Sequence, residues 1–208
     1  MQQCAKVPEP WVDCFFLCSF TRAQIDDMQG LQRFQEGELR IVNEAVAIAE
    51  EITSNAYKIS SAEWRGQRYD IKTLADLIPN EVLHEGPFAQ IIRYVGRKTQ
   101  TLLSSSEYDF YKICLQDHTI LFALKKFPEL RLFPFTLYIV THELIHVIRF
   151  TKFLQAFDAS ASEKIIEEAR VHEKTKAILR PTQTPGMGAV FEFYRAWQGP
   201  LDDLRDMQ

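Results

Sequence analysis

The sequence predicts a mainly α fold, with α+β as the alternative, because three segments carry helical patterning. The chain has 208 residues, of which 46% are hydrophobic and 25% charged, the proportions of a globular protein. Apolar residues recur at steps of three and four over 38–53, and long apolar periodic segments cover 135–157 and 161–179. We therefore expect one domain over 1–208, built largely from helices.

The first of these helices has a clear apolar face. Glu44, Glu50 and Glu51 lie on the side opposite to this face. The apolar positions share spacings of three or four residues, and they include Leu39, Val42, Ala45, Val46, Ala49 and Ile52. This arrangement predicts a helix that packs one side onto a core.

The other two helices carry start and stop signals. Pro134 suits the first turn of a helix, because proline lacks the N–H that this turn leaves unbonded. Ser160 and Glu163 have the spacing of a capping box. Pro181 then ends the last helix. The two helices are thus expected to form a pair over 135–181.

The remaining segments are less regular. We interpret 1–37 as an N-terminal extension that packs on the body, and 54–87 as a loop-rich connection rich in Gly and Pro. The pattern over 88–103 favours another helix. Residues 108–126 fit either strand or helix, and we expect them to supply a small edge sheet.

Charge and cysteine content exclude several classes of protein. A net charge of −4 without a long basic cluster argues against nucleic-acid binding. The apolar stretch 133–150 contains several ionisable side chains, so we predict a buried helix and no membrane span. We expect the four cysteines to be thiols of a cytoplasmic protein, as no basic leader precedes an apolar run; a metal site at Cys4, Cys14 and Cys18 is the weaker alternative.

The segment His142-Glu143-Leu144-Ile145-His146 carries the chemistry. Residues four apart on a helix lie about 40° apart around the axis and about 6 Å apart along it, so both imidazoles face the same way. Imidazole nitrogens bind zinc well. Glu143 lies about 100° from His142 around the helix, where its carboxylate can take a proton from water as a general base.

A catalytic zinc ion needs a third protein ligand, and the helix 161–179 offers candidates. Glu168 shares an inward stripe with Ile165 and Ala169, and a carboxylate is seldom buried unless it is paired or bound to metal. We therefore prefer Glu168 to Glu167, which stays open as an alternative. His172, one turn later, is predicted to be either another ligand or a group that supports Glu168.

These motifs resemble the gluzincin metallopeptidases. The segment HELIH, followed by a helix with Glu167-Glu168-Ala169, is similar to the compact ImmA/IrrE-type zincin domains. The resemblance implies one zinc ion held by His142, His146 and Glu168, with Glu143 as the base and a peptide or protein as the substrate. It leaves the oligomeric state and the residue that stabilises the oxyanion open; Tyr138, Tyr194, Arg195 and His118 are candidates.

Three other interpretations compete with a peptidase. A ferritin-like di-metal protein would use Glu143 and His146 together with Glu44 and Glu168. A non-catalytic interaction module would keep the fold and the metal without the reaction. Alternatively, the two histidines are core residues that Glu168 and Glu143 satisfy by hydrogen bonds. His84 and His118 are expected in loops or on the surface.

Overall fold

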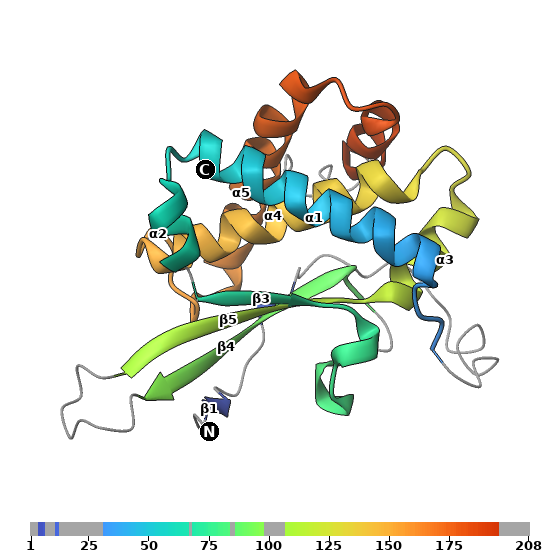
Figure 1. Cartoon of the computed structure of the whole chain (residues 1–208). Coiled ribbons are helices and arrows are strands. Elements are labelled where there is room, and N and C mark those ends of the chain that lie inside the picture. The colour runs from blue at the N-terminus through green and yellow to red at the C-terminus, as the bar shows by residue number, and fades with distance from the viewer. Residues whose placement is uncertain are drawn as a thin grey trace.

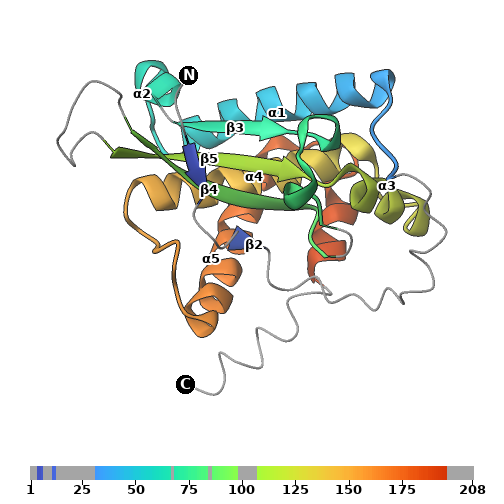
Figure 2. The ribbon, with the colours of Figure 1, turned by 90° about the horizontal axis from the view of Figure 1, so that it is seen from below.

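The computed structural model describes residues 4–6, 11–12, 31–66, 68–83, 86–97 and 107–195, and it confirms a mainly helical fold with a small sheet (Figure 1). The helices gather on one face of the sheet, with α1 and α4 lying above it (Figures 1 and 2). The α-helices are α1 (Glu36–Ala56), α2 (Ser61–Gly66), α3 (Asp117–Lys126), α4 (Leu132–Thr151) and α5 (Ala161–Leu179). Another helix is described over 187–195, and single 3-10 turns cover Leu74–Asp76, Pro79–Glu81 and Arg180–Thr182.

The sheet has the strand order β1-β4-β5-β3, with β2 also paired to β4. The strands are β1 (Cys4–Lys6), β2 (Trp11–Val12), β3 (Tyr69–Lys72), β4 (Ala89–Arg97) and β5 (Glu107–Leu115). Strands β4 and β5 pair antiparallel over their whole length, whereas β3 pairs parallel to β5. Strands β1 and β2 attach parts of the predicted N-terminal extension to β4.

One prediction for the region around the sheet was wrong. The segment 88–103 was expected to form a helix, but its described part is strand β4, because β-branched Ile91, Ile92 and Val95 find a partner in β5. The small sheet expected from 108–126 is confirmed: this segment forms most of β5, which lies between β4 and β3, and the chain then continues into α3. A short apolar pattern could not reveal these partners.

The prediction that 54–87 is a loop-rich connection is only partly confirmed. This stretch includes the end of α1, the short helix α2 and strand β3, with two 3-10 turns after it. Strand β3 is only four residues long and depends on β5 for its hydrogen bonds. Its sequence alone therefore gave too weak a signal.

The two helices of the predicted pair over 135–181 begin as the sequence predicts. Pro134 lies in the first turn of α4. At the start of α5, the Glu163 N–H donates to Ser160 Oγ and the Ser160 N–H donates to the Glu163 carboxylate, which confirms the capping box. Helix α4, however, ends at Thr151 and not at the predicted residue 157.

The early end of α4 is a Schellman turn. Phe153 adopts a left-handed φ of 53°, the Leu154 N–H donates to the Arg149 carbonyl at 2.8 Å, and the Phe153 N–H donates to the Phe150 carbonyl. This motif usually has glycine at the left-handed position. The residue there is Phe153, so the sequence did not predict the turn. The turn sends the chain back alongside α4.

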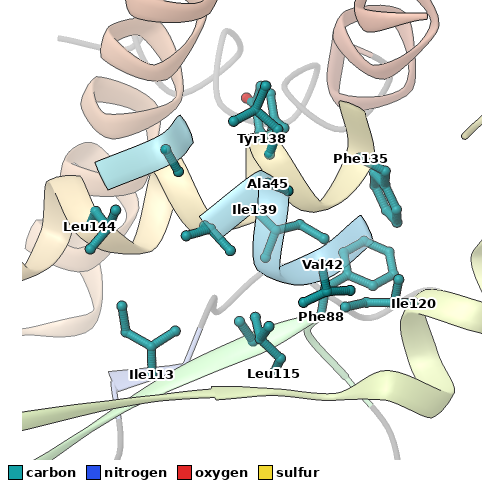
Figure 3. Close-up of a cluster of buried hydrophobic side chains, with 14 of the residues drawn as sticks. Val42, Ala45, Phe88, Ile113, Leu115, Ile120, Phe135, Tyr138, Ile139 and Leu144 are labelled. Carbon is teal, nitrogen blue, oxygen red and sulfur yellow. The ribbon is translucent and has the colours of Figure 1, made fainter. Parts of the chain in front are cut away.

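Helix α4 forms the centre of the core. Ile139 and Leu144 lie above Ile113 and Leu115 of β5, whereas Tyr138 lies farther from the sheet (Figure 3). Complete burial of one such aliphatic side chain contributes about 1.5–3 kcal/mol. Although α4 is largely apolar, none of the helices in the described residues has the length and apolar character needed to cross a membrane.

The buried carboxylate of Asp117, just after the end of β5, joins three segments by hydrogen bonds. Asp117 accepts hydrogen bonds from the Phe34 N–H and the Leu74 N–H, each at 3.0 Å. Burial raises the pKa of Asp117, although the two N–H groups oppose this change. The side chain thus joins the start of α3 to the segment before α1 and to the turn after β3.

Replacement of Asp117 by Ala should destabilise the fold by about 2–4 kcal/mol, because two buried N–H groups lose their acceptor. Urea unfolding followed by circular dichroism measures this change. Asp76→Ala is the matched control; Asp76 is exposed, and its replacement should change stability by no more than about 0.5 kcal/mol. Equal stability of the two variants would contradict the bridging role of Asp117.

Candidate metal centre

Helix α4 aligns His142 and His146 on the face that meets α5. One helical turn separates them, and their ring centroids are 4.8 Å apart. The two Nε2 atoms lie 3.1 Å from each other. Both side chains are buried, with exposed fractions of 2% and 1%. The sequence prediction that these imidazoles point toward one place is confirmed.

Helix α5 brings Glu168 to the same place. Its Oε2 atom lies 3.1 Å from His142 Nε2, and its Oε1 atom lies 3.1 Å from His146 Nε2. The carboxylate is 2% exposed. Three donor groups from two neighbouring helices therefore converge in the interior, as expected from the inward stripe on α5.

With Glu168 as a carboxylate, hydrogen bonds alone do not satisfy these three contacts. Each Nε2 atom carries either one hydrogen or one lone pair. If Nε2 of His142 and Nε2 of His146 both carry hydrogens, these hydrogens oppose each other across 3.1 Å. If either Nε2 atom lacks a hydrogen, its lone pair faces the carboxylate of Glu168. With Glu168 ionised, no assignment of hydrogens to the two Nε2 atoms makes all three contacts favourable.

A cation at the centre removes this conflict. Zinc bonds to nitrogen and oxygen are about 2.0–2.1 Å long, and a tetrahedron with such bonds has edges of about 3.3 Å. The separations of 3.1 Å among the donor atoms are close to that edge length. The residues present therefore fit a zinc ion in size and in donor chemistry.

His172 lies one turn after Glu168 and belongs to the same cluster. His142, Glu168 and His172 each offer a ligand atom within 4.8 Å of the others. The His172 ring is 4.3 Å from the His142 ring between centroids, and its Nδ1 atom is 2.9 Å from the Tyr138 hydroxyl. Both predicted roles for His172, as a ligand or as a supporting group, are compatible with this position.

The imidazoles of His146 and His172 experience opposite electrostatic effects. Burial lowers the pKa of His146, but the carboxylate of Glu168 outweighs this effect and raises the pKa above its usual value. Burial, reinforced by His142, holds the pKa of His172 well below its usual value. His172 is thus an uncharged imidazole in the interior at neutral pH.

Glu143 is buried beside this cluster on the next position of α4. Its exposed fraction is 3%, and its negative charge contributes to raising the pKa of His146. The carboxylate of Glu143 is therefore near enough to His146 to affect its electrostatics. Its burial beside His142 and its electrostatic effect on His146 are compatible with the role of proton acceptor predicted for Glu143.

Glu167, the alternative to Glu168, faces a different partner. Its carboxylate accepts hydrogen bonds from Arg149 of α4 and Arg170 of α5. The pair of Arg149 and Glu167 is largely buried, with side-chain exposed fractions of 15% and 7%. Glu167 therefore fastens α5 to α4 rather than entering the ligand cluster.

Sequence reasoning missed Gln155, which lies in the loop after α4 and contacts His146. Its Oε1 atom is 3.3 Å from His146 Nδ1. A carbonyl oxygen can only accept, so Nδ1 carries the hydrogen, and in the uncharged imidazole the Nε2 lone pair then faces the cluster. Gln155 was placed inside the predicted helix 135–157, where it would not have turned toward His146; only the early helix end brings it there.

Of the other predicted site residues, Tyr138 and Tyr194 lie next to the cluster, whereas Arg195 lies on the surface. Tyr194 stacks on Tyr138 at 4.2 Å between centroids and lies 5.3 Å from His172, so Tyr138 and Tyr194 both border the cluster. Arg195, in contrast, pairs with Glu192 on the surface. Among the described residues these two tyrosines are the oxyanion candidates that the fold brings to the centre.

Three further predictions concern residues elsewhere. His118 was expected in a loop or on the surface, but it is buried in α3 with its Nε2 atom 2.8 Å from the Leu83 carbonyl oxygen. Glu44 is exposed on α1 and does not belong to the cluster. His84, Cys14 and Cys18 lie outside the described residues, as does the side chain of Cys4, so the predicted cysteine site lies outside them as well.

Comparison of the chain with known protein families, with curated proteins and with solved structures found no match. The metal centre is therefore inferred from the residues and geometry of this chain.

A matched pair of substitutions separates the two adjacent glutamates. Glu168→Gln should weaken zinc binding by more than the roughly 10–100-fold that loss of an outer-shell partner costs. Glu167→Gln should leave zinc binding unchanged but lower stability by about 1–3 kcal/mol, because Arg149 loses its largely buried partner while Arg170 remains solvated. Calorimetric zinc titration and urea unfolding measure the two effects, and the opposite pattern would reassign the ligand.

Removal of the Gln155 carbonyl should loosen the orientation of His146. We expect Gln155→Leu to reduce zinc affinity by roughly 10–100-fold, because Nδ1 of His146 loses its acceptor. Competition with a chromophoric chelator measures this affinity. The exposed neighbour Leu154 supplies the control, since Leu154→Gln should leave the affinity as it is.

Proposed function

We propose that this chain is a zinc-dependent metallopeptidase that binds one ion and hydrolyses peptide bonds with water. The supporting observation is the convergence of His142 Nε2, His146 Nε2 and the Glu168 carboxylate at separations of 3.1 Å. Glu143, buried beside them, adds the group that such a reaction requires.

Each ligand has a distinct contribution in this proposal. The two imidazoles offer neutral nitrogen donors, and Gln155 holds the tautomer of His146 that leaves its Nε2 lone pair free. The carboxylate of Glu168 supplies one negative charge against the divalent cation, which lowers the cost of charge burial. Three protein ligands leave a fourth position for water or substrate.

In this proposal the zinc ion and the side chains of the protein have separate roles in the reaction. Bound zinc supplies Lewis acidity, which polarises a carbonyl oxygen and lowers the pKa of water. Glu143 accepts a proton from the attacking water and delivers it to the leaving amine nitrogen, as the peptide C–N bond breaks. Tyr194, which borders the centre, is the described candidate for a hydrogen bond to the developing oxyanion, because the Tyr138 hydroxyl pairs with His172.

The substrate in this proposal is a peptide or a protein, and the site of action is the cytoplasm. A net charge of −4 favours neither nucleic acid nor an anionic surface as a partner. The ferritin-like alternative has less support, because Glu44 is exposed whereas His142, His146 and Glu168 are buried. We therefore expect one metal ion per chain.

Glu143→Gln is the decisive substitution for catalysis. The variant should bind one zinc ion per chain like the unaltered protein, because Glu143 is not a ligand in this arrangement. Its peptide hydrolysis should fall by roughly 10²–10⁴-fold, the usual contribution of a general base. Elemental analysis and cleavage of a fluorogenic peptide library measure the two properties.

His146→Ala is the control for metal binding, and it should lose both zinc and hydrolysis. Zinc binding by the unaltered chain without any cleavage across the library would favour the non-catalytic module. Two iron ions per chain would support the ferritin-like protein. Absence of bound metal in protein purified under metal-replete conditions would refute the proposal.

A further inference from the structure

Tyr138 and His172 form a polar pair at the edge of the ligand cluster. Tyr138 projects from α4 one turn before His142, and its hydroxyl oxygen lies 2.9 Å from His172 Nδ1. Tyr138 has no exposed surface, and Tyr194 stacks on its ring at 4.2 Å between centroids. The hydroxyl is therefore held firmly against the imidazole.

The position of His172 gives it a second possible partner, the metal ion. One of its ring nitrogens belongs to a group of ligand atoms that lie within 4.8 Å of one another, together with His142 and Glu168. With His146, these residues would make four protein ligands. Four protein ligands produce a closed, structural type of zinc site, whereas a catalytic site keeps one position open.

The hydrogen bond with Tyr138 decides between these two states. A buried phenol needs an acceptor for its hydrogen, and an uncharged imidazole offers one lone pair and one N–H. When the Tyr138 O–H donates to Nδ1, that lone pair is used and Nε2 carries the hydrogen. Neither nitrogen of His172 can then bind a cation, whichever of them is nearer to the ion.

We propose that Tyr138 keeps His172 away from the metal and thereby preserves an open coordination position. This inference rests on the zinc site of the proposed function, but it does not require peptidase activity. Tyr138 is in this respect a positioning residue that acts through His172. Without its hydroxyl, His172 would supply a fourth ligand and convert an open centre into a closed one.

Cobalt-substituted protein tests this inference through its absorption spectrum and its rate of metal release. In the unaltered chain, azide should enter the open position and change the visible cobalt bands. In Tyr138→Phe, azide should leave the bands unchanged, and release of cobalt to excess chelator should slow by roughly tenfold or more. The double variant Tyr138→Phe with His172→Ala should regain the azide response and the original release rate.

His172→Ala alone is the matched control, and it should respond to azide like the unaltered chain. The inference is overturned if Tyr138→Phe, folded by circular dichroism, keeps the azide response and the original rate of release. If the unaltered chain binds no zinc or cobalt, the proposed function fails together with this inference. Normal metal binding with an unaffected Tyr138→Phe variant overturns the inference alone.

A measurement on the unaltered chain avoids dependence on the folding of any variant. With ¹⁵N-labelled histidine in the zinc-loaded protein, the His172 signals should report hydrogen on Nε2 and an accepted hydrogen bond at Nδ1. The His172→Ala spectrum identifies these signals. A metal-bound nitrogen on His172, or hydrogen on Nδ1, would overturn the inference.

Discussion

The contact between α4 and α5 at His142, His146 and Glu168 is the constraint on which the rest of the structure depends. Three polar groups meet there in a region almost closed to water. Burial of such groups without a suitable partner costs several kcal/mol. With Glu168 ionised, no arrangement of hydrogens satisfies their mutual contacts, whereas the proposed cation would satisfy them and would stabilise the contact of the two helices.

The sheet, α1 and α5 hold α4 in the position that brings its histidines to Glu168. One side of the helix packs on the sheet and on α1, which fixes the position of the two imidazoles (Figure 3). The pair of Arg149 and Glu167 fastens α5 to α4 beside the cluster. A metal site on two packed helices keeps its geometry more closely than a site on loops. The Schellman turn then adds Gln155 from the loop, which orients His146.

Several features of the fold and the site were predictable because they depend on local spacing. The four-residue step from His142 to His146 directs both rings to one side of any helix, and the stripe with Ile165 and Ala169 points Glu168 inward. The capping box at Ser160 likewise needs only adjacent residues. Strand β4 was mistaken for a helix because Ile91, Ile92 and Val95 suit both forms, and only hydrogen bonds to β5 select the strand.

The sequence by itself determined the donor groups, the faces of α4 and α5 on which they lie, and the preference for Glu168 over Glu167. The tertiary structure decided the end of α4 at Thr151, the contact of Gln155 with His146, and the pairing of Tyr138 with His172. The physical reason is the range of the interactions. Helical periodicity and capping act within a few residues, whereas the approach of a loop or a second helix depends on packing between segments distant in the chain.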